Sequence, residues 1–416
     1  MLPTIRQDGT SMWAVLFEPL AKLAAAHEFL STNRSFHDKM VFADKTTHER
    51  TGLMSKISHV WNHIQTNLFP FLVEELGPLT EPQRKLVAIL ELIRIEDFVP
   101  ARWWRLGRPP KDRVALAKGF VAKMVSNCAN TRALIDLLES APALRRICGW
   151  ERLGAVPSES TFSRAFEEFA TGELPSRVHA ALIARHESGR LVGHLSRDAT
   201  DIAAREKPAA HSTSAPPPKP KAKRGRPKKG EARPAPAPTR LQRQPTMTLD
   251  EMLADLPTAC AWGTKSKNGK TYHWKGYKLH VDWADGEIPV SAVLTSASVN
   301  DSQAAIPLAA MSAARVVSLY DLMDAAYDAE AIRAYSRSLG HVPIIDRNPR
   351  GGETAAMAAA EKRRYDERST AERGFSLFKE GFGGRQVRVR GYAKVWAHVM
   401  FGLLALTAER LLNLLL

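Results

Sequence analysis

One segment of the chain has a composition that cannot build a hydrophobic core. Residues 207–245 carry 11 Lys and Arg against a single Glu, and apolar residues other than alanine are nearly absent. Such a segment buries too little surface to offset the entropy lost on folding, so we expect a disordered basic linker. It separates a helical N-terminal sequence from a C-terminal sequence of mixed pattern.

The charge of the chain favours a polyanionic partner. The 416 residues include 59 Lys and Arg against 44 Asp and Glu, a net charge of +15, and most of the excess lies in 207–245. An excess of this size suits DNA or an anionic membrane surface.

The cysteines and the ends of the chain bear on its compartment. Cys128, Cys148 and Cys260 have no C-x-x-C spacing, which argues against a structural zinc site or a disulfide framework and fits a reducing cytoplasm. The first residues do not resemble a signal peptide. The apolar stretch 395–416 is interrupted by charges, which favours a buried or dimer-forming helix over a membrane span.

Residues 1–189 show the periodicity of helices. Apolar residues recur at i, i+3 and i+4 in the stretches 19–30, 81–99, 111–127 and 131–140. We therefore expect an all-helical N-terminal region, and its position before the mixed part suits a DNA-binding role.

A helix-turn-helix pattern spans about residues 141–170. Gly154 interrupts the first helix, and Pro157 followed by Ser158 begins the second. The second helix would place Arg164 near its start, where recognition helices meet DNA. A plain helical hairpin with a serine cap explains the same residues.

From residue 190 the pattern becomes that of an α/β domain. We expect strands at 190–200, 270–283, 287–297, 314–324 and 341–346, and helices at 300–313, 328–340 and about 353–382. The order β-β-β-α-β-α-β-α, with three antiparallel strands leading into crossovers, indicates a mixed sheet with helices on both faces. The expected domain is 190–416, interrupted by the basic linker.

Two aspartates stand at strand ends in this domain, Asp198 on the first strand and Asp324 on the fourth. If these strands are neighbours, both carboxylates meet at one edge, and Glu372 on the last helix can face them. Three carboxylates suit Mg²⁺ or Mn²⁺, and two such ions can clamp a phosphodiester. Asp201 and Asp321 are near rivals, because a strand-end aspartate is often a turn or cap residue.

The last predicted helix has a stripe of four polar residues. Tyr365, Arg368, Glu372 and Lys379 fall within a sector of roughly 60°. One interpretation is a solvated face with an Arg368–Glu372 pair. The other is a metal ligand, Glu372, flanked by DNA-binding side chains.

The same four residues carry a family resemblance. Their spacing resembles the Y-(2)-R-(3)-E-(6)-K signature of bacterial insertion-sequence transposases of the DDE class. The stretch "SRDAT" is similar to the family's first-aspartate strand, and "SASVNDSQ" to its approach to the next helix. The stretch "MDAAYD" is similar to its A-D-x-G-Y-D motif, with Ala326 in place of the usual glycine.

The resemblance covers roughly residues 190–416 and implies a ribonuclease H-like catalytic domain. It implies that Asp198, Asp324 and Glu372 are the catalytic and metal-binding triad, with two Mg²⁺ or Mn²⁺ ions, and that Tyr365, Arg368 and Lys379 contact DNA. It further implies terminal inverted repeats and target DNA as partners, a homodimer or larger assembly on DNA, no membrane, and a bacterial, nucleoid-associated cytoplasmic protein.

Two basic stretches add candidate DNA contacts. "KRGRPKKG" at 223–230 resembles an AT-hook, in which Arg224 and Arg226 would enter an A·T-rich minor groove. A basic tether that contacts only phosphates is the alternative. "KTYHWKGYK" at 270–278 could stack on unpaired bases or form aromatic pairs within a hairpin.

The function implied by the resemblance is metal-dependent cleavage at element ends and strand transfer into target DNA. A non-catalytic DNA-binding regulator derived from a transposase and a hydrolytic nuclease are the alternatives. The interval 325–371 is too short for the β insertion that some relatives carry, which leaves a hairpin intermediate an open question.

Overall fold

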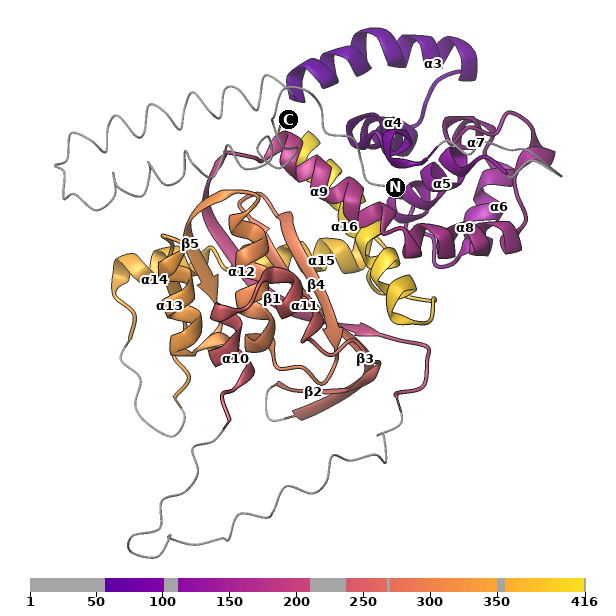
Figure 1. Cartoon of the computed structure of the whole chain (residues 1–416). Helices are drawn as coiled ribbons and strands as arrows, with labels where there is room; N and C mark the ends of the chain where they lie inside the picture. The colour runs from indigo at the N-terminus through magenta and orange to yellow at the C-terminus, as the bar shows by residue number, and fades with distance from the viewer. Residues whose placement is uncertain (1–56, 101–110, 210–236, 268–269, 350–355, 415–416) are drawn as a thin grey trace, which may run out of the picture. The chain divides into compact units, whose positions relative to one another are not determined.

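The computed structural model describes residues 57–100, 111–209, 237–267, 270–349 and 356–414. Its N-terminal part is helical (Figure 1). After a helical segment at 57–63, the elements are η1 (a π-helix, Ile64–Leu68), α3 (Phe69–Leu76), α4 (Glu81–Ile93), η2 (Ile95–Phe98), α5 (Arg113–Val125), α6 (Thr131–Ser140), α7 (Pro142–Ile147), η3 (Leu153–Ala155), α8 (Glu159–Thr171) and α9 (Leu174–His186). The helices predicted within 81–140 are confirmed, and the stretch 19–30 lies outside the described residues.

Local capping explains where these helices begin. The side chain of Asp112 accepts hydrogen bonds from two backbone amides at the start of α5, and Asn130 accepts one at the start of α6. Thr80 and Gln83 form a capping box at the start of α4. The apolar faces then meet around Phe120, whose ring contacts aromatic residues of α8 and of the last helix.

The C-terminal part contains one mixed sheet. Within the described residues its strands are β1 (Leu191–Ala203), β2 (Ala261–Lys267), β3 (Lys270–Ala284), β4 (Ile288–Ser296), β5 (Val317–Met323) and β6 (Val342–Ile345). The order is β2-β3-β1-β5-β6, with β4 also paired to β3. Pairs of β3 with β1, β2 and β4 are antiparallel, whereas β1–β5 and β5–β6 are parallel.

The sequence predicted five of these strands and missed β2. The β2 sequence, "AWGTKSK", has little of the β-branched and aromatic content that marks a strand. It forms because it pairs with the outer part of β3, from Lys270 to Gly276. The first and fourth predicted strands are neighbours in the β1–β5 ladder, which was the condition for Asp198 and Asp324 to meet at one edge.

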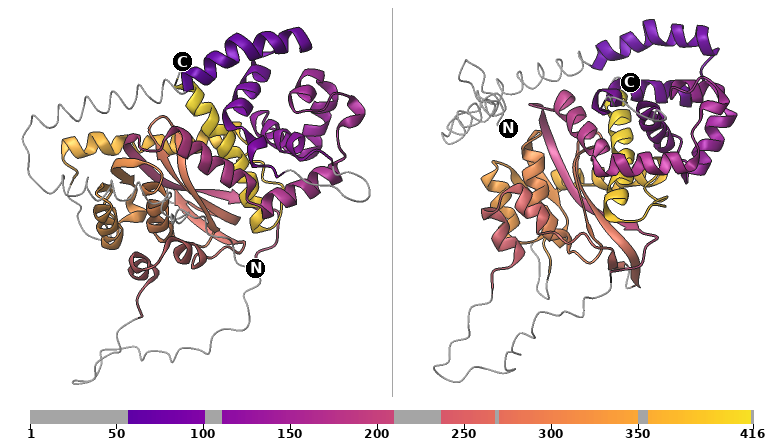
Figure 2. Two further views of the ribbon diagram at one scale, coloured as in Figure 1. Left: turned by 45° about the horizontal axis from the view of Figure 1, so that its top comes forward. Right: turned by 45° about the vertical axis from the view of Figure 1, so that its right-hand side comes forward.

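Helices cover both faces of the sheet (Figure 2). They are α10 (Arg240–Arg243), η4 (Gln244–Thr246), α11 (Leu249–Ala254), η5 (Asp301–Ala304), α12 (Ala305–Ala313), η6 (Ala325–Tyr327), α13 (Glu330–Ser338), α14 (Ala359–Asp366), α15 (Ser369–Gly381) and α16 (Tyr392–Asn413). The consecutive residues Asp282 and Trp283 of β3 separate the two faces: Asp282 contacts Ser312 of α12, whereas Trp283 lies against Gly374 of α15.

The single helix predicted over about 353–382 is wrong. The structure has two helices, α14 and α15, which meet at Glu367 and Arg368. The hydroxyl of Ser196 on β1 donates a hydrogen bond to the carbonyl of Glu367 at 3.3 Å. A side chain that inserts into the helical hydrogen-bond ladder is a common cause of a break.

The disorder predicted for 207–245 is wrong at its C-terminal end. Arg240–Arg243 form α10 behind a capping box of Thr239 and Gln242, and Gln244 is fully buried. Arg240 also pairs with Asp255, with Nε 2.7 Å from Oδ2, which ties α10 to α11. Residues 210–236, including Arg224 and Arg226, lie outside the described residues.

The described residues contain one helix, α16, that is long and apolar enough to cross a membrane. Most of its residues are buried in the fold, where it contacts α4, α5, α8, α9 and β4. The buried helix expected from the sequence is therefore present.

Candidate active site

The register of β1 and β5 places two aspartates side by side. The two strands are parallel, and Arg197 lies opposite Met323 at the last paired position. Asp198 follows Arg197, and Asp324 follows Met323, so the two aspartates come directly after this pair. Backbone amides fix both carboxylates: Ala199 donates to Asp198 at 2.7 Å and Ala326 donates to Asp324 at 2.9 Å.

The electrostatics of this pair favour protonation. Burial raises the pKa of Asp198 to about 6, and the negative charge of Asp324 raises it further. The hydrogen bond from the Ala199 amide and the charge of Arg368 act in the opposite direction. Burial also raises the pKa of Asp324, and the charge of Asp301 acts in the same direction. Two partly buried, adjacent acids lack a full complement of positive charge, which a bound cation would supply.

Arg368 connects this pair to Glu372. Glu372 lies in the first turn of α15, and its Oε1 is 2.6 Å from Nη2 of Arg368. Nη1 of Arg368 is 3.7 Å from Oδ2 of Asp198, and the arginine side chain is only 19% exposed. The guanidinium therefore lies between two of the three acids that the sequence singled out.

The other two stripe residues also have partners within the fold. Nζ of Lys379 is 2.9 Å from Oδ1 of Asp201, and the lysine side chain is 19% exposed. The ring centroid of Tyr365 lies 5.8 Å from the guanidinium of Arg368. A solvated stripe with one exposed pair does not describe this arrangement, because both cations turn toward β1.

The rival aspartates are engaged elsewhere. Asp201 pairs with Lys379 as described, and Asp321 is fully buried with Oδ1 3.2 Å from Nδ1 of His341. Although burial opposes it, the hydrogen bond from His341 and the charge of Arg197 lower the pKa of Asp321. Asp321 therefore contributes to the interior of the sheet.

The donor set suits a hard divalent cation. Asp198 and Asp324 offer adjacent carboxylate oxygens, the ligands that Mg²⁺ and Mn²⁺ prefer. Throughout the described ranges, no three His, Cys, Asp or Glu side chains are grouped closely enough to hold a metal ion. Glu372 is instead held by Arg368, so a three-carboxylate metal site stays a prediction.

A glycine brings the helix that carries Glu372 close to the sheet. A Cβ at Gly374 would lie 2.4 Å from the ring of Trp283, which is fully buried and packs edge-on against Phe375. Gly374 is thus required for the close contact between α15 and β3. Gly374 was not among the residues predicted for the site, although its position two residues after Glu372 could have pointed to it.

A buried ion pair supports β1 behind the carboxylates. Nε and Nη2 of Arg197 each donate to Asp282 at 2.8 Å, and Ser312 donates to the same carboxylate at 2.6 Å. Both charged side chains are almost completely buried. Asp198 therefore follows a residue that is fixed within the sheet.

The predicted recognition helix exists as α8. It begins after Ser158, and its buried face includes Phe162 and Phe166. Arg164 lies on the exposed face, where its Nε donates to the carbonyl of Ser160 at 3.3 Å. Its contact with DNA stays a prediction.

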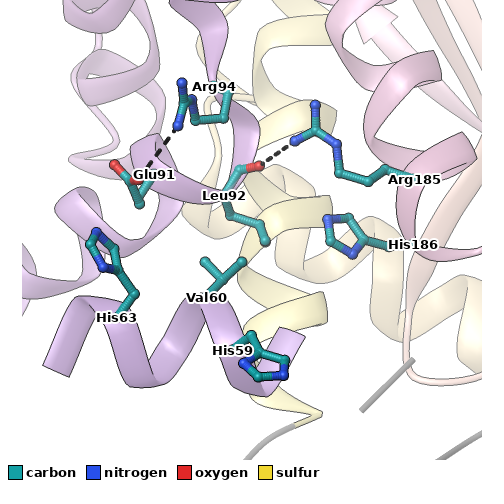
Figure 3. Close-up of a pocket in the computed structure, with 8 residues that line it drawn as sticks. All are labelled: His59, Val60, His63, Glu91, Leu92, Arg94, Arg185 and His186. Carbon is teal, nitrogen blue, oxygen red and sulfur yellow. Dashed lines mark hydrogen bonds and ion pairs between the residues drawn. The ribbon is translucent and has the colours of Figure 1, made fainter. Parts of the chain in front are cut away.

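A separate pocket of about 350 Å³ lies among the N-terminal helices (Figure 3). It is lined by His59, Val60, His63, Glu91, Leu92, Arg94, Arg185 and His186. Arg94 faces Glu91 at 3.8 Å, and Arg185 donates to the carbonyl of Leu92. The Arg185 contact connects α9 to α4, whereas the Arg94–Glu91 pair lies at the end of α4. The pocket contains none of the candidate catalytic acids.

Comparison with protein families agrees with the geometry. The family model described as "Transposase DDE domain" matches residues 196–408, and the one described as "Transposase domain (DUF772)" matches residues 71–168. No curated protein and no solved structure gave a significant match.

Proposed function

This chain belongs to the family of transposase DDE domains, and we propose that it cleaves DNA at the ends of an insertion sequence and joins those ends to target DNA. Family membership implies DNA as its partner. The observation that carries the catalytic proposal is that Asp198 and Asp324 lie side by side just beyond the β1–β5 ladder. Arg368 pairs with both Asp198 and Glu372 and so connects the third acid to this pair. Non-enzymatic DNA binding alone would not need two adjacent, partly buried carboxylates with raised pKa values.

The three acids have distinct environments. Asp198 and Asp324 are fixed by backbone amides, so their oxygens are already oriented when DNA arrives. Glu372 is 62% exposed and stands on the helix, so it can turn from Arg368 toward the pair. Together these residues would hold Mg²⁺ or Mn²⁺, which would lower the pKa of the attacking water or 3′-hydroxyl and neutralise charge on the phosphate.

Arg368 then has a second task. In the DNA-free protein it neutralises Asp198 and Glu372. With a bound cation neutralising these acids, the Arg368 guanidinium would be free to bind a phosphate oxygen through its planar fork. Lys379, at the other end of α15, would bind a phosphate farther along the same strand, and Tyr365 would support Arg368 through its ring.

The remaining predicted contacts serve binding rather than chemistry. Arg164 on α8 would contact element ends, and Arg224 and Arg226 would bind an A·T-rich minor groove. Cleavage at two ends requires two active sites, so we propose a dimer or larger assembly on DNA.

The test uses the purified chain and labelled DNA carrying the repeats that flank its coding region, with Mg²⁺ added. Asp198→Asn, Asp324→Asn and Glu372→Gln should each lower the cleavage rate by about 10³-fold or more, because metal-assisted charge stabilisation supplies several kcal/mol. Binding to the same DNA should remain within about threefold, since each change removes negative charge near the phosphates.

Asp250→Asn is the matched control. Asp250 is exposed on α11, and the change removes one carboxylate of the same size, so cleavage should be unchanged. Wild-type binding without any cleavage would support the non-catalytic regulator instead. Cleavage without joining of a pre-cut 3′ end would support the hydrolytic nuclease.

A further inference from the structure

The hairpin of β2 and β3 extends beyond the rest of the sheet and presents aromatic side chains to solvent. Residues 270–276 of β3 pair with β2, whereas residues 276–284 pair with β1. Tyr272 is 55% exposed and Trp262 is 58% exposed. Exposed Tyr and Trp side chains are enriched at binding interfaces, so each of these rings is available to contact a ligand.

The register separates these two aromatic residues. Tyr272 lies directly opposite Lys265, so both project to one face of the hairpin. Trp262 lies opposite Lys275, an odd number of residues from Lys265, and projects to the other face.

A third aromatic residue is already used by the fold. The ring of Trp274 covers Gly263, where a Cβ would lie 2.4 Å from it, and its indole N–H donates to the carbonyl of Tyr277 at 3.2 Å. Trp274 therefore stiffens the hairpin on the face that carries Tyr272 and Lys265.

The hairpin carries positive charge only. Residues 261–281 contain no Asp or Glu and five lysines, at positions 265, 267, 270, 275 and 278. Among the described residues, no carboxylate lies within ion-pair distance of Lys265 or Lys270. A basic strand pair with an exposed aromatic ring is complementary to a nucleic-acid backbone with accessible base faces.

Strand β3 leads from the hairpin directly to the candidate active site. Residues 270–276 pair with β2, and residues 276–284 pair with the part of β1 that carries Asp198 and Asp201. Asp201 lies opposite Lys278 of β3 and pairs with Lys379 of α15. In agreement with this placement, burial raises the pKa of Asp198 and Asp324, and the charge of Lys265 acts against that rise.

We propose that the Tyr272–Lys265 face of this hairpin binds unpaired nucleotides beside the scissile phosphate, with Tyr272 stacked on a base and Lys265 and Lys270 on phosphates. In duplex DNA the base faces are covered by their neighbours, so an aromatic ring has nothing to stack on. The face therefore selects DNA that is single-stranded or frayed at the cut. This rests on the proposed function for the identity of the DNA, but its test does not require cleavage.

The experiment measures binding of the full chain in EDTA to a fluorescein-labelled oligothymidylate and to a duplex of equal length, each of about 20 nucleotides, by anisotropy at several salt concentrations. Tyr272→Ala should weaken binding to the single strand by about 5- to 100-fold, the range for loss of one base–aromatic stack. Tyr272→Phe should keep wild-type affinity, because the ring stacks without its hydroxyl. Duplex binding should be unchanged in both variants.

Trp262→Ala is the matched control, since it removes an equally exposed ring from the opposite face of the hairpin. It should leave single-strand affinity unchanged. Lys265→Ala should lower single-strand affinity. It should also reduce the slope of log K against log salt concentration by about 0.7, the value expected for loss of one phosphate contact on a single strand. Circular dichroism and melting temperature confirm that the exposed-residue variants remain folded.

Wild-type affinity in Tyr272→Ala, an equal loss on duplex, or a larger loss in Trp262→Ala would each overturn the proposal. Because no metal is present, single-strand binding can succeed even if Asp198→Asn leaves cleavage intact. That combination would contradict the proposed catalytic triad alone. Normal triad behaviour with an unaffected Tyr272→Ala would contradict the hairpin alone.

Discussion

Arg368 is the residue on which the candidate site depends most. Its guanidinium reaches Asp198 with one nitrogen and Glu372 with another, and it lies over the ring of Tyr365. A lysine has one compact ammonium group and cannot match both directions. Lys379 differs, because it makes one contact, to Asp201, that a point charge fully satisfies.

This difference predicts an asymmetric response to conservative exchange. Arg368→Lys should lower the cleavage rate by about 10- to 100-fold, as expected for loss of one charge-assisted hydrogen bond of about 1.5–3 kcal/mol. Lys379→Arg should change it by less than about threefold, because the charge is kept. Single-turnover cleavage of end-containing DNA measures both, and equal rates in the two variants would refute a forked role for Arg368.

At the scale of elements, the position of α15 on the sheet decides where Glu372 and Arg368 stand. The helix approaches β3 closely because Gly374 leaves room for the ring of Trp283. Glycine inside a helix normally costs about 1 kcal/mol relative to alanine. The close packing of α15 on Trp283 offsets that cost, and this explains why a glycine occupies the middle of the helix.

Gly374→Ala should therefore act against helix propensity. The added methyl would overlap the Trp283 ring, and overpacking of this kind costs about 1–3 kcal/mol. We expect a lower melting temperature and a slower cleavage rate, because α15 must move away from β1. Gly381→Ala, on the same helix with no atom within 4 Å of the new Cβ, should be neutral or stabilising. If the Gly374→Ala protein were as stable and active as wild type, the Trp283 ring would have to move aside without cost, which would contradict this prediction.

Sequence patterns predicted most elements but not the contacts that shape the site. Apolar periodicity was sufficient for α4, α5 and α6, and strand-end aspartates pointed to Asp198 and Asp324. The break before α15 was not predictable, because it involves a serine that is 171 residues from Glu367 in the chain. The strand β2 was missed for a related reason, since its stability comes from β3 rather than from its own residues.

At the scale of the whole molecule, one hydrophobic core joins the N-terminal helices, the sheet and α16. This core contains neutral histidines. His398 is buried with Nε2 3.0 Å from the carbonyl of Gly383, and burial together with the charge of Lys123 lowers its pKa to about 3. Burial also lowers the pKa of His179 to about 3 and of His280 to about 4.

These histidines predict acid sensitivity. In the unfolded chain they bind protons below about pH 6.5, whereas in the folded protein they remain neutral, so stability falls as the pH falls from 6.5 toward 4. For His398 alone the loss between pH 6.5 and 5 should reach about 2 kcal/mol. His398→Gln should remove that part of the pH dependence, measured by urea unfolding, whereas His59→Gln at an exposed site should leave it intact. An unchanged slope in His398→Gln would contradict a buried neutral imidazole.

The place of α16 in the core has a consequence for biosynthesis. On the ribosome, the sheet and the N-terminal helices emerge first, but the apolar surfaces of α5, α8, α9 and β4 that α16 covers stay open until residues 392–413 leave the exit tunnel. A nascent chain therefore cannot complete its core, or hold α15 firmly, before translation has passed this point. Premature stop codons or frameshifts upstream of residue 392 should therefore yield products that lack a complete core and are degraded.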